Sequence, residues 1–319
     1  MLGVIIPVYN RPDNLRMALK SLELQTKDRF FTIVVDDCSE ENIKEVCNEF
    51  NSLHLKYIRL NKNSGPGAAR QMGLNFAYKI NLDSVIFLDS DDRLCPNAVE
   101  RLSYELNHSK SNLIVSDIIA EHKNKPDFLK EGINSMTWLH GKIYRTSFLQ
   151  KNNICFPTDF KTNEDLGFNL CVYNAIEDED KKYIPQQLYL WRDDNNSITH
   201  NNELASICNG IDFINAVYFY FNYCKNNMQP IKKPNILLEC YYYYQLTLIR
   251  DNNITEEIDE KLKEMFSHYM FIIPLSNRDN WYNLWTNNFA IYEKKFYFFK
   301  ETLYDWLNRL EFDFSILGE

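Results

Sequence analysis

The sequence lacks long apolar runs and any excess of positive charge. Its longest unbroken apolar stretch, around residues 216–221, falls far short of the roughly 20 apolar residues that a membrane-spanning helix needs. The net charge of −9 gives no general attraction to nucleic acid or to anionic lipid. No basic stretch or cleavage site accompanies the apolar residues after Met1. We therefore expect a cytoplasmic protein without a transmembrane span, and peripheral contact with the inner membrane face stays open.

Cysteine pairs typical of zinc or redox sites are also absent. The eight cysteines include no C-x-x-C pair, which excludes zinc-ribbon and thioredoxin-like motifs, so we expect reduced thiols. Glycine is scarce as well: there are nine, and Gly65, Gly67 and Gly73 fall close together. Because glycine permits left-handed backbone and the close approach of other groups, this segment is expected to need a special backbone conformation.

Apolar residues make up 45% of the chain and charged residues 25%, as in folded globular proteins. In the first 110 residues, four apolar runs alternate with amphipathic segments and predict strands at 2–9, 31–35, 53–60 and 84–88. Further strands are expected at 113–119, 142–144 and 183–191, with helices at 146–152 and 162–174. This alternation predicts an α/β fold with a mostly parallel sheet and helices on both faces.

After residue 200 the pattern changes to long helical stretches, predicted at 203–221, 235–250 and 256–269. Aromatic residues are about twice as dense here as in the preceding 200 residues. We predict one domain over 1–200 and a helical, aromatic-rich region over 201–319. An ordinary core against the first domain is favoured for this region, and a face for homo-oligomers, an acceptor-binding arm and a membrane-surface contact stay open.

Acidic residues follow two of the predicted strands, at the edge of the sheet where open α/β folds bind ligands. Residues 89–92 (DSDD) end the fourth strand, and the carboxylates of Asp89 and Asp91 suit Mg²⁺ or Mn²⁺. The alternative is an Asp-rich turn that caps the next helix. Asp36 and Asp37 end the second strand, where a carboxylate can accept a hydrogen bond from uracil or ribose, or cap a helix.

Residues 63–70 (NSGPGAAR) follow the third predicted strand and open a helix. They match a dinucleotide-binding fingerprint only in part, because Arg70 takes the place of its third glycine, and the chain has no P-loop motif. Arg70 is a candidate for facing an anion at the helix N-terminus. A solvated arginine is the alternative.

Two later segments carry further candidates. Residues 162–165 (TNED) match a capping box ahead of an apolar helix, and a carboxylate there is also a candidate general base. Arg192 and Ser197 follow the last predicted strand and are candidates for binding a diphosphate. His200 is a candidate metal ligand or a plain surface residue.

In this order and spacing, the segments resemble inverting glycosyltransferase family 2, whose members have the GT-A fold. The resemblance covers residues 2–200 and is to the non-processive branch, since the Q-x-x-R-W motif of processive synthases is missing. Cys38 stands where the family usually has glycine. The motifs are VIIPVYNR (4–11), VVDDCSEE (34–41), NSGPGAAR (63–70), IFLDSDD (86–92), HGKIYRTSFLQKNNICFP (140–157), NEDLGF (163–168) and YLWRDDNNSIT (189–199).

The resemblance implies the transfer of one sugar from a nucleotide diphosphate donor, usually UDP-linked, to a hydroxyl group with inversion. It implies a divalent metal, Mn²⁺ or Mg²⁺, held by Asp91 and Asp89, with Asp92 as their neighbour and His200 as a further candidate. It implies Asp165 as catalytic base, with Glu164 beside it on the donor sugar or the acceptor. The implied nucleotide contacts are Pro7, Tyr9, Asp37, Asn63, Arg70, Asp89, Arg192 and Ser197.

Two other functions stay open at this point, a sugar nucleotidyltransferase and a non-catalytic sugar-nucleotide-binding scaffold. The first is disfavoured because residues 9–12 (YNRP), rather than a glycine-rich loop, follow the first strand. The expected acceptor is a glycan or another hydroxyl compound, as in polysaccharide biosynthesis. The acidic charge disfavours a nucleic acid acceptor without excluding it.

Overall fold

The computed structural model describes residues 1–27, 29–122, 125–129, 132–159, 161–192, 202–233 and 256–272, together with Ile236 and Cys240. The chain divides into two compact units, Met1–Ser197 and Ile198–Glu319. The first unit contains the sheet and the helices that pack against it. The described residues of the second unit lie mostly in helices.

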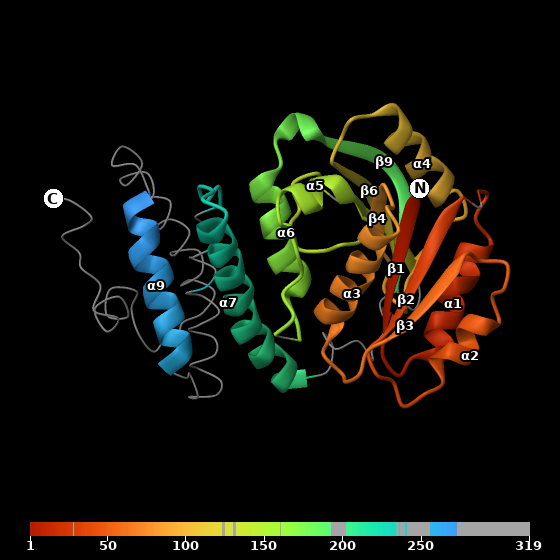
Figure 1. Cartoon of the computed structure of the whole chain (residues 1–319), viewed down its shortest axis with the longest axis horizontal. Coiled ribbons are helices and arrows are strands. Elements are labelled where there is room, and N and C mark those ends of the chain that lie inside the picture. Colours follow the sequence, from red (N-terminus) through yellow and green to blue (C-terminus); the bar gives the residue numbers. More distant parts are fainter. Residues whose placement is uncertain are drawn as a thin grey trace. The chain divides into compact units, whose positions relative to one another are not determined.

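The N-terminal half of the sheet is parallel throughout. The strands β1 (Leu2–Val8), β2 (Phe30–Asp36), β3 (Leu55–Arg59) and β4 (Ser84–Phe87) lie in the order β3-β2-β1-β4. The connecting helices are α1 (Pro12–Glu23), α2 (Ile43–Asn48) and α3 (Pro66–Lys79). Figure 1 shows α1 and α2 on one face of these strands and α3 on the other. Every residue of β1 is buried, as expected for a central strand covered on both faces.

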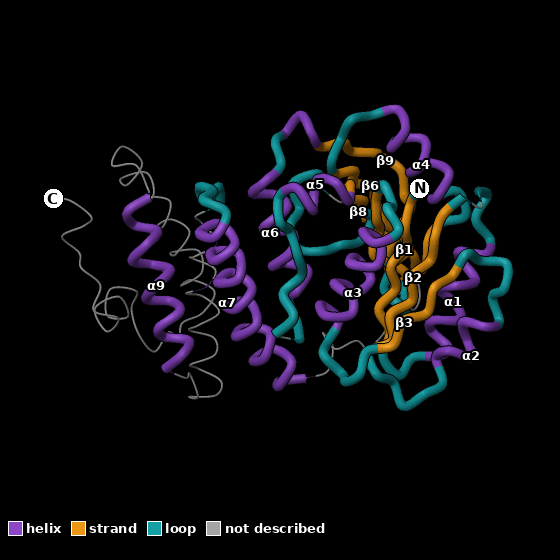
Figure 2. Tube along the Cα trace, in the orientation of Figure 1, coloured by secondary structure: helices purple, strands orange, loops and turns teal. Residues whose placement is uncertain are grey.

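The second half of the sheet is mixed, with both parallel and antiparallel pairs. Strand β8 (Lys142–Arg145) runs antiparallel to β4. Strand β6 (Leu113–His122) runs antiparallel to β8 and therefore in the same direction as β4. Strand β9 (Lys181–Arg192) is parallel to β6, whereas the short β5 (Arg93–Leu94) and β7 (Lys125–Leu129) pair antiparallel at the margins. Helices α4 (Ala98–His108), α5 (Thr146–Lys151) and α6 (Glu164–Ala175) complete the unit. Figure 2 shows these strands in orange between purple helices.

The core of the first unit is formed by the apolar faces that the periodicity predicts. On one side of the sheet, Leu15, Leu19 and Leu22 of α1 pack against the inward side chains of β1 and β2, including Val4 and Val34, and all five are buried. The predicted α/β class, with helices on both faces of the sheet, is therefore confirmed.

The glycine-rich segment needs its glycines for two different reasons. Gly65, which precedes α3, has a φ of 88°, a conformation that side chains disfavour. Gly67 lies against the segment before α6, where a Cβ atom would come 2.2 Å from the carbonyl oxygen of Pro157. The start of α3 can therefore approach the chain around Glu164 only without a side chain at position 67.

The described part of the second unit is mostly helical. Helices α7 (Asn202–Asn226) and α9 (Glu256–Ile272) lie side by side, and Tyr218 donates a hydrogen bond of 2.7 Å to Glu264. Phe213, Tyr220 and Phe221 are buried, which agrees with an aromatic-rich core. The helix predicted over 235–250 falls outside the described residues except at Ile236 and Cys240. None of the helices in the described ranges is long and apolar enough to cross a membrane.

Candidate active site

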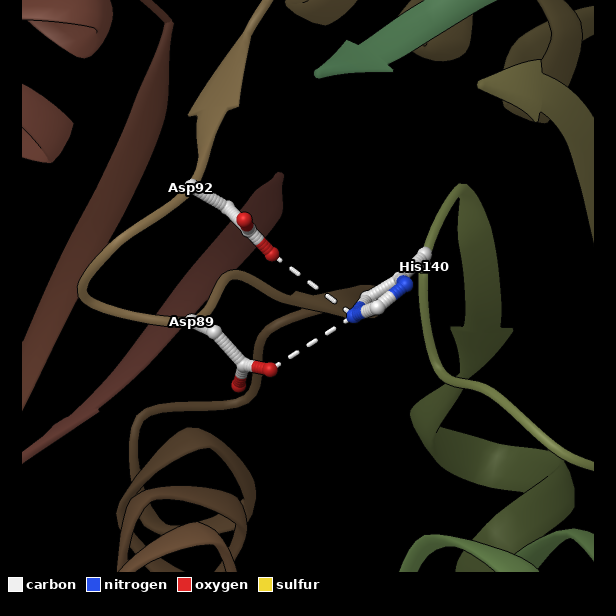
Figure 3. A group of neighbouring side chains, drawn as sticks. All are labelled: Asp89, Asp92 and His140. Carbon is white, nitrogen blue, oxygen red and sulfur yellow. Dashed lines mark ion pairs between the residues drawn. The ribbon is translucent and has the colours of Figure 1, made fainter. Parts of the chain in front are cut away.

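The first feature of the site is a cluster of two carboxylates and one imidazole. Asp89 and Asp92 come from the turn between β4 and β5, and His140 lies just before β8. One ligand atom from each residue lies within 4.8 Å of the others. Figure 3 shows both carboxylates directed at the same imidazole nitrogen, with His140 Nε2 at 3.5 Å from Asp89 and 3.6 Å from Asp92. Two carboxylate oxygens and one imidazole nitrogen at this spacing could hold a divalent metal ion.

The ring of His140 is fixed by aromatic neighbours. It stacks on Tyr189 of β9 with ring centroids 4.9 Å apart and an interplanar angle of 24°. The ring is almost buried, and among the described residues its Nδ1 atom has no hydrogen-bond partner. The stacking therefore holds Nε2 toward the carboxylates.

Asp92 is the most deeply buried carboxylate of the turn. Its two oxygens accept hydrogen bonds from the hydroxyl group of Tyr189 at 2.6 Å and from the backbone N–H of Arg192 at 2.8 Å. Burial raises the pKa of Asp92 to about 7, although the nearby His140 acts in the opposite direction. A positive charge placed beside this carboxylate would favour its ionised form.

Arg70 joins this cluster to the start of α6. Its guanidinium is buried, forms an ion pair of 2.5 Å with Asp89 and forms a second ion pair with Glu164. Burial would raise the pKa of Asp89, but Arg70 and His140 outweigh burial and lower it. At Glu164, burial dominates over Arg70 and raises the pKa to about 7.

Asp165 follows Glu164 in the first turn of α6. Its carboxylate accepts a hydrogen bond of 2.7 Å from the N–H of Leu166, and burial raises its pKa. The predicted capping box is wrong. The N-cap residue is Asn163, which has a φ of 60° and makes no side-chain capping bond, so Thr162 lies outside the helix.

The paired aspartates at the end of β2 hold loops in place. Both oxygens of Asp37 accept backbone N–H groups, from Ser64 and Gly65, at 2.7 Å each. Asp36 accepts bonds from Tyr57 at 2.6 Å and from Arg59 at 2.5 Å. Asp37 thus ties the end of β2 to the loop that opens α3.

The structure brings some predicted residues together and places others apart. Arg70 contacts both Asp89 and Glu164, and Asp165 follows Glu164 in the chain. Asp91 instead forms an ion pair with Arg11, and it is not in the Asp89, Asp92 and His140 cluster. Its role as metal ligand stays a prediction. Ser197 and His200 lie outside the described residues.

The remaining predicted nucleotide contacts line the same end of the parallel strands. Pro7 is buried in β1, whereas Tyr9 directly after β1 is 42% exposed and Asn63 is exposed. Arg192 ends β9 and is half-buried. Sequence reasoning assigned no role to His140, although this residue opens the motif HGKIYR; only the fold brings it to the acidic turn.

Comparison with known proteins agrees with this architecture. Poly(ribitol-phosphate) beta-N-acetylglucosaminyltransferase TarS of Staphylococcus aureus is 32% identical over 186 residues, which cover 54% of this chain and 32% of that protein. Uncharacterized glycosyltransferase YibD of Escherichia coli is 27% identical over 223 residues, covering 62% of this chain and 63% of YibD. The chain thus spans about a third of the length of TarS.

Solved structures show the same fold. S. aureus TarS 1–349 in complex with UDP-GlcNAc superposes with a TM-score of 0.63 at 19% identity, covering 87% of this chain and 83% of that one. Mannosyltransferase PcManGT of Pyrobaculum calidifontis in complex with GDP-Man and Mn²⁺ gives a TM-score of 0.51 at 12% identity, over 84% and 73%. The expected GT-A fold is confirmed. The family model described as Glycosyl transferase family 2 matches residues 3–162, and the chain belongs to this family.

Proposed function

We propose that this glycosyltransferase moves one sugar from a UDP-linked donor to an acceptor hydroxyl group, with inversion and with a divalent metal. Residues 1–200 form the catalytic domain in this proposal, and residues 201–319 form a separate helical region. The observation that carries it is the contact of Arg70 with both Asp89 and Glu164. This contact brings the candidate metal-binding turn to the start of α6, where the candidate base Asp165 follows Glu164.

The side chains of the cluster fit a divalent ion. Asp89, Asp92 and His140 would hold it, since they supply hard oxygen atoms and one imidazole nitrogen within 4.8 Å of one another. When bound, such an ion stabilises negative charge on a departing diphosphate. The Mn²⁺ in the complex of the mannosyltransferase PcManGT supports this part of the proposal. Asp91 and His200 remain predicted contributors.

Asp165 is the proposed general base. The acceptor oxygen attacks the anomeric carbon and gives its proton to the Asp165 carboxylate, while the bond from that carbon to the diphosphate oxygen breaks. A base with a raised pKa holds the transferred proton better, and burial raises the pKa of Asp165 in this way. Glu164 is held by Arg70 and therefore serves to orient the start of α6 rather than to take the proton.

The donor nucleotide is proposed to lie along the ends of β1, β2 and β4. The exposed ring of Tyr9 would stack on the base, with Pro7, Asp37 and Asn63 around it. Arg192 and Ser197 would contact the diphosphate. Complexes of TarS with UDP-GlcNAc and UDP support a UDP-linked donor.

The names of the relatives support a polyol-phosphate polymer as acceptor. Both TarS and a Bacillus spizizenii relative, 26% identical over 188 residues, are named as transferases acting on poly(ribitol-phosphate). A further relative in Bacillus subtilis is named a minor teichoic acid biosynthesis protein. We therefore place this chain in the biosynthesis of a cell-surface polymer.

The test is nucleotide release from a panel of UDP- and GDP-sugars, each with Mn²⁺ or with EDTA, and with or without poly(ribitol-phosphate). We expect metal-dependent release of UDP from one donor, accelerated by the polymer. Pyrophosphate release from a nucleoside triphosphate would instead indicate a nucleotidyltransferase. Donor binding without any release, with the acceptor present, would indicate a binding protein.

A further inference from the structure

Arg11 and Asp91 form an ion pair that joins the ends of two neighbouring strands. Strands β1 and β4 are parallel partners, so their carboxyl ends lie at the same edge of the sheet. Arg11 follows β1, Asp91 follows β4, and the guanidinium donates to the Asp91 carboxylate. Asp91 lies within the same turn as Asp89 and Asp92, the two acidic members of the proposed metal site.

The backbone before Arg11 is held in place by the segment that follows β2. Asn10 has a φ of 50°, its N–H donates to the hydroxyl group of Ser39 at 2.9 Å, and its side-chain oxygen accepts from the N–H of Glu40 at 2.7 Å. Asparagine tolerates this left-handed conformation better than most residues. Arg11 therefore starts from a fixed backbone, while its long side chain keeps the freedom to change partner.

The other acidic side chains of the turn have partners that are harder to displace. Asp89 is 31% exposed, but its partner Arg70 is only 7% exposed and is also held by Glu164, and Asp92 accepts from Tyr189 and the backbone of Arg192. In the Arg11 and Asp91 pair, the side chains are 31% and 18% exposed. Partly exposed ion pairs are weak, so an anionic ligand can compete for the guanidinium.

From this we propose that Arg11 is a positioning residue that makes metal binding depend on the donor. In the free enzyme Arg11 masks the charge of Asp91. When the donor binds, Arg11 turns to the anionic diphosphate, and the released Asp91 adds its negative charge to the metal site. This inference rests on the proposed function, because it assumes both a metal and a diphosphate donor.

The consequence is a thermodynamic coupling between two ligands. Mn²⁺ binds weakly alone and more tightly with UDP, and UDP affinity rises by the same factor when Mn²⁺ is present. Arg11→Gln removes the masking charge, so Asp91 attracts the metal without the nucleotide. We expect this variant to bind Mn²⁺ alone about fivefold or more tightly than the wild type. We also expect UDP to enhance that binding less.

The experiment is calorimetric titration of the full chain with Mn²⁺, without and with saturating UDP, in the wild type, Arg11→Gln, Arg11→Lys and Arg16→Gln. Arg11→Lys keeps the charge and should retain most of the coupling. Arg16 lies on α1, the helix that Arg11 precedes, and pairs with Glu49 and Asp13 at the surface, so its variant should match the wild type. Thermal unfolding of each variant checks that it is folded.

Three results would overturn the inference. The first is an Arg11→Gln variant with unchanged Mn²⁺ affinity and unchanged enhancement by UDP. The second is an Arg11→Gln variant that loses UDP affinity equally with and without Mn²⁺, which would make Arg11 a simple phosphate ligand. The third is a wild type that binds no Mn²⁺ under either condition, which would also overturn the metal-dependent function, whereas the first two leave that function intact.

Discussion

The guanidinium of Arg70 forms a buried ion pair with the carboxylate of Glu164, which lies 94 residues further along the chain. The same guanidinium pairs with Asp89, so one side chain links α3, the turn after β4 and the start of α6. Gly67 permits this approach, because a side chain there would collide with the segment before α6. The candidate site is therefore held together from within by Arg70.

Arg70→Met should destabilise the protein strongly. It leaves the buried carboxylate of Glu164 and the half-buried carboxylate of Asp89 without their counter-charge, and breaking a buried pair typically costs about 3–5 kcal/mol. Urea unfolding would measure the loss, with Arg16→Met as a surface control that should cost no more than about 1 kcal/mol. Adding Glu164→Gln to Arg70→Met should recover part of the loss. Equal effects of the Arg70 and Arg16 variants would contradict the linking role.

The parallel half of the fold could be predicted from the sequence because it depends on local patterns. The apolar run that became β1 is long and continuous, and α1 carries its apolar residues at helical spacing. The mixed half could not be predicted in the same way. Strand β5 has two residues and no periodicity, and the direction in which β8 pairs with β4 depends on contacts between distant segments.

The residues of the candidate site also differ in whether the sequence predicts them. Arg70 and Asp165 could be singled out because they belong to motifs whose order resembles a family. His140 carries no local signal of its function, since its place beside Asp89 arises only when β8 and β4 pair. The cap of α6 was mispredicted because the left-handed conformation of Asn163 does not follow from a sequence that also fits a capping box.

Asp36→Asn should lower the free energy of unfolding at neutral pH and should lower it less at acidic pH. Burial would raise the pKa of Asp36, but hydrogen bonds from Ser39, Tyr57 and Arg59 outweigh it and lower the pKa. A lowered pKa in the folded state contributes stability above the unfolded value of about 3.9, and this contribution is lost as the pH falls through the folded value.

Urea unfolding of the wild type and Asp36→Asn at several pH values would measure this effect. We expect a difference of about 1.5–3 kcal/mol at pH 7, as for hydrogen bonds to a charged group, and a decreasing difference below about pH 4. Asp13→Asn, at an exposed carboxylate, is the control. A difference that stays constant down to pH 3 would show that the charge of Asp36 is not the cause.

His140→Phe should weaken metal binding while keeping the fold. Phenylalanine preserves a ring that can stack on Tyr189 but removes the nitrogen that faces Asp89 and Asp92. Even indirect partners at metal sites typically contribute 10–100-fold to affinity, so we expect Mn²⁺ affinity to fall at least about tenfold. Calorimetry with UDP present would measure it, with His108→Phe on the exposed face of α4 as control. Unchanged Mn²⁺ affinity would remove His140 from the metal site.

Asp165→Asn should abolish most turnover and leave donor binding intact. The amide cannot take the acceptor proton, and a general base typically contributes about 10²–10⁴-fold to the rate, so we expect at least about a 10²-fold loss in kcat. Because burial raises the pKa of Asp165, wild-type activity should fall toward acid at a pH above the usual aspartate range. Initial rates from pH 4 to 9 and UDP-sugar affinity would be measured together. Asp159→Asn, an exposed aspartate shortly before α6, should behave as the wild type. Near-normal turnover of Asp165→Asn would assign the base to another residue. Parallel losses of turnover and donor affinity would show that Asp165 binds the donor and does not act as the base.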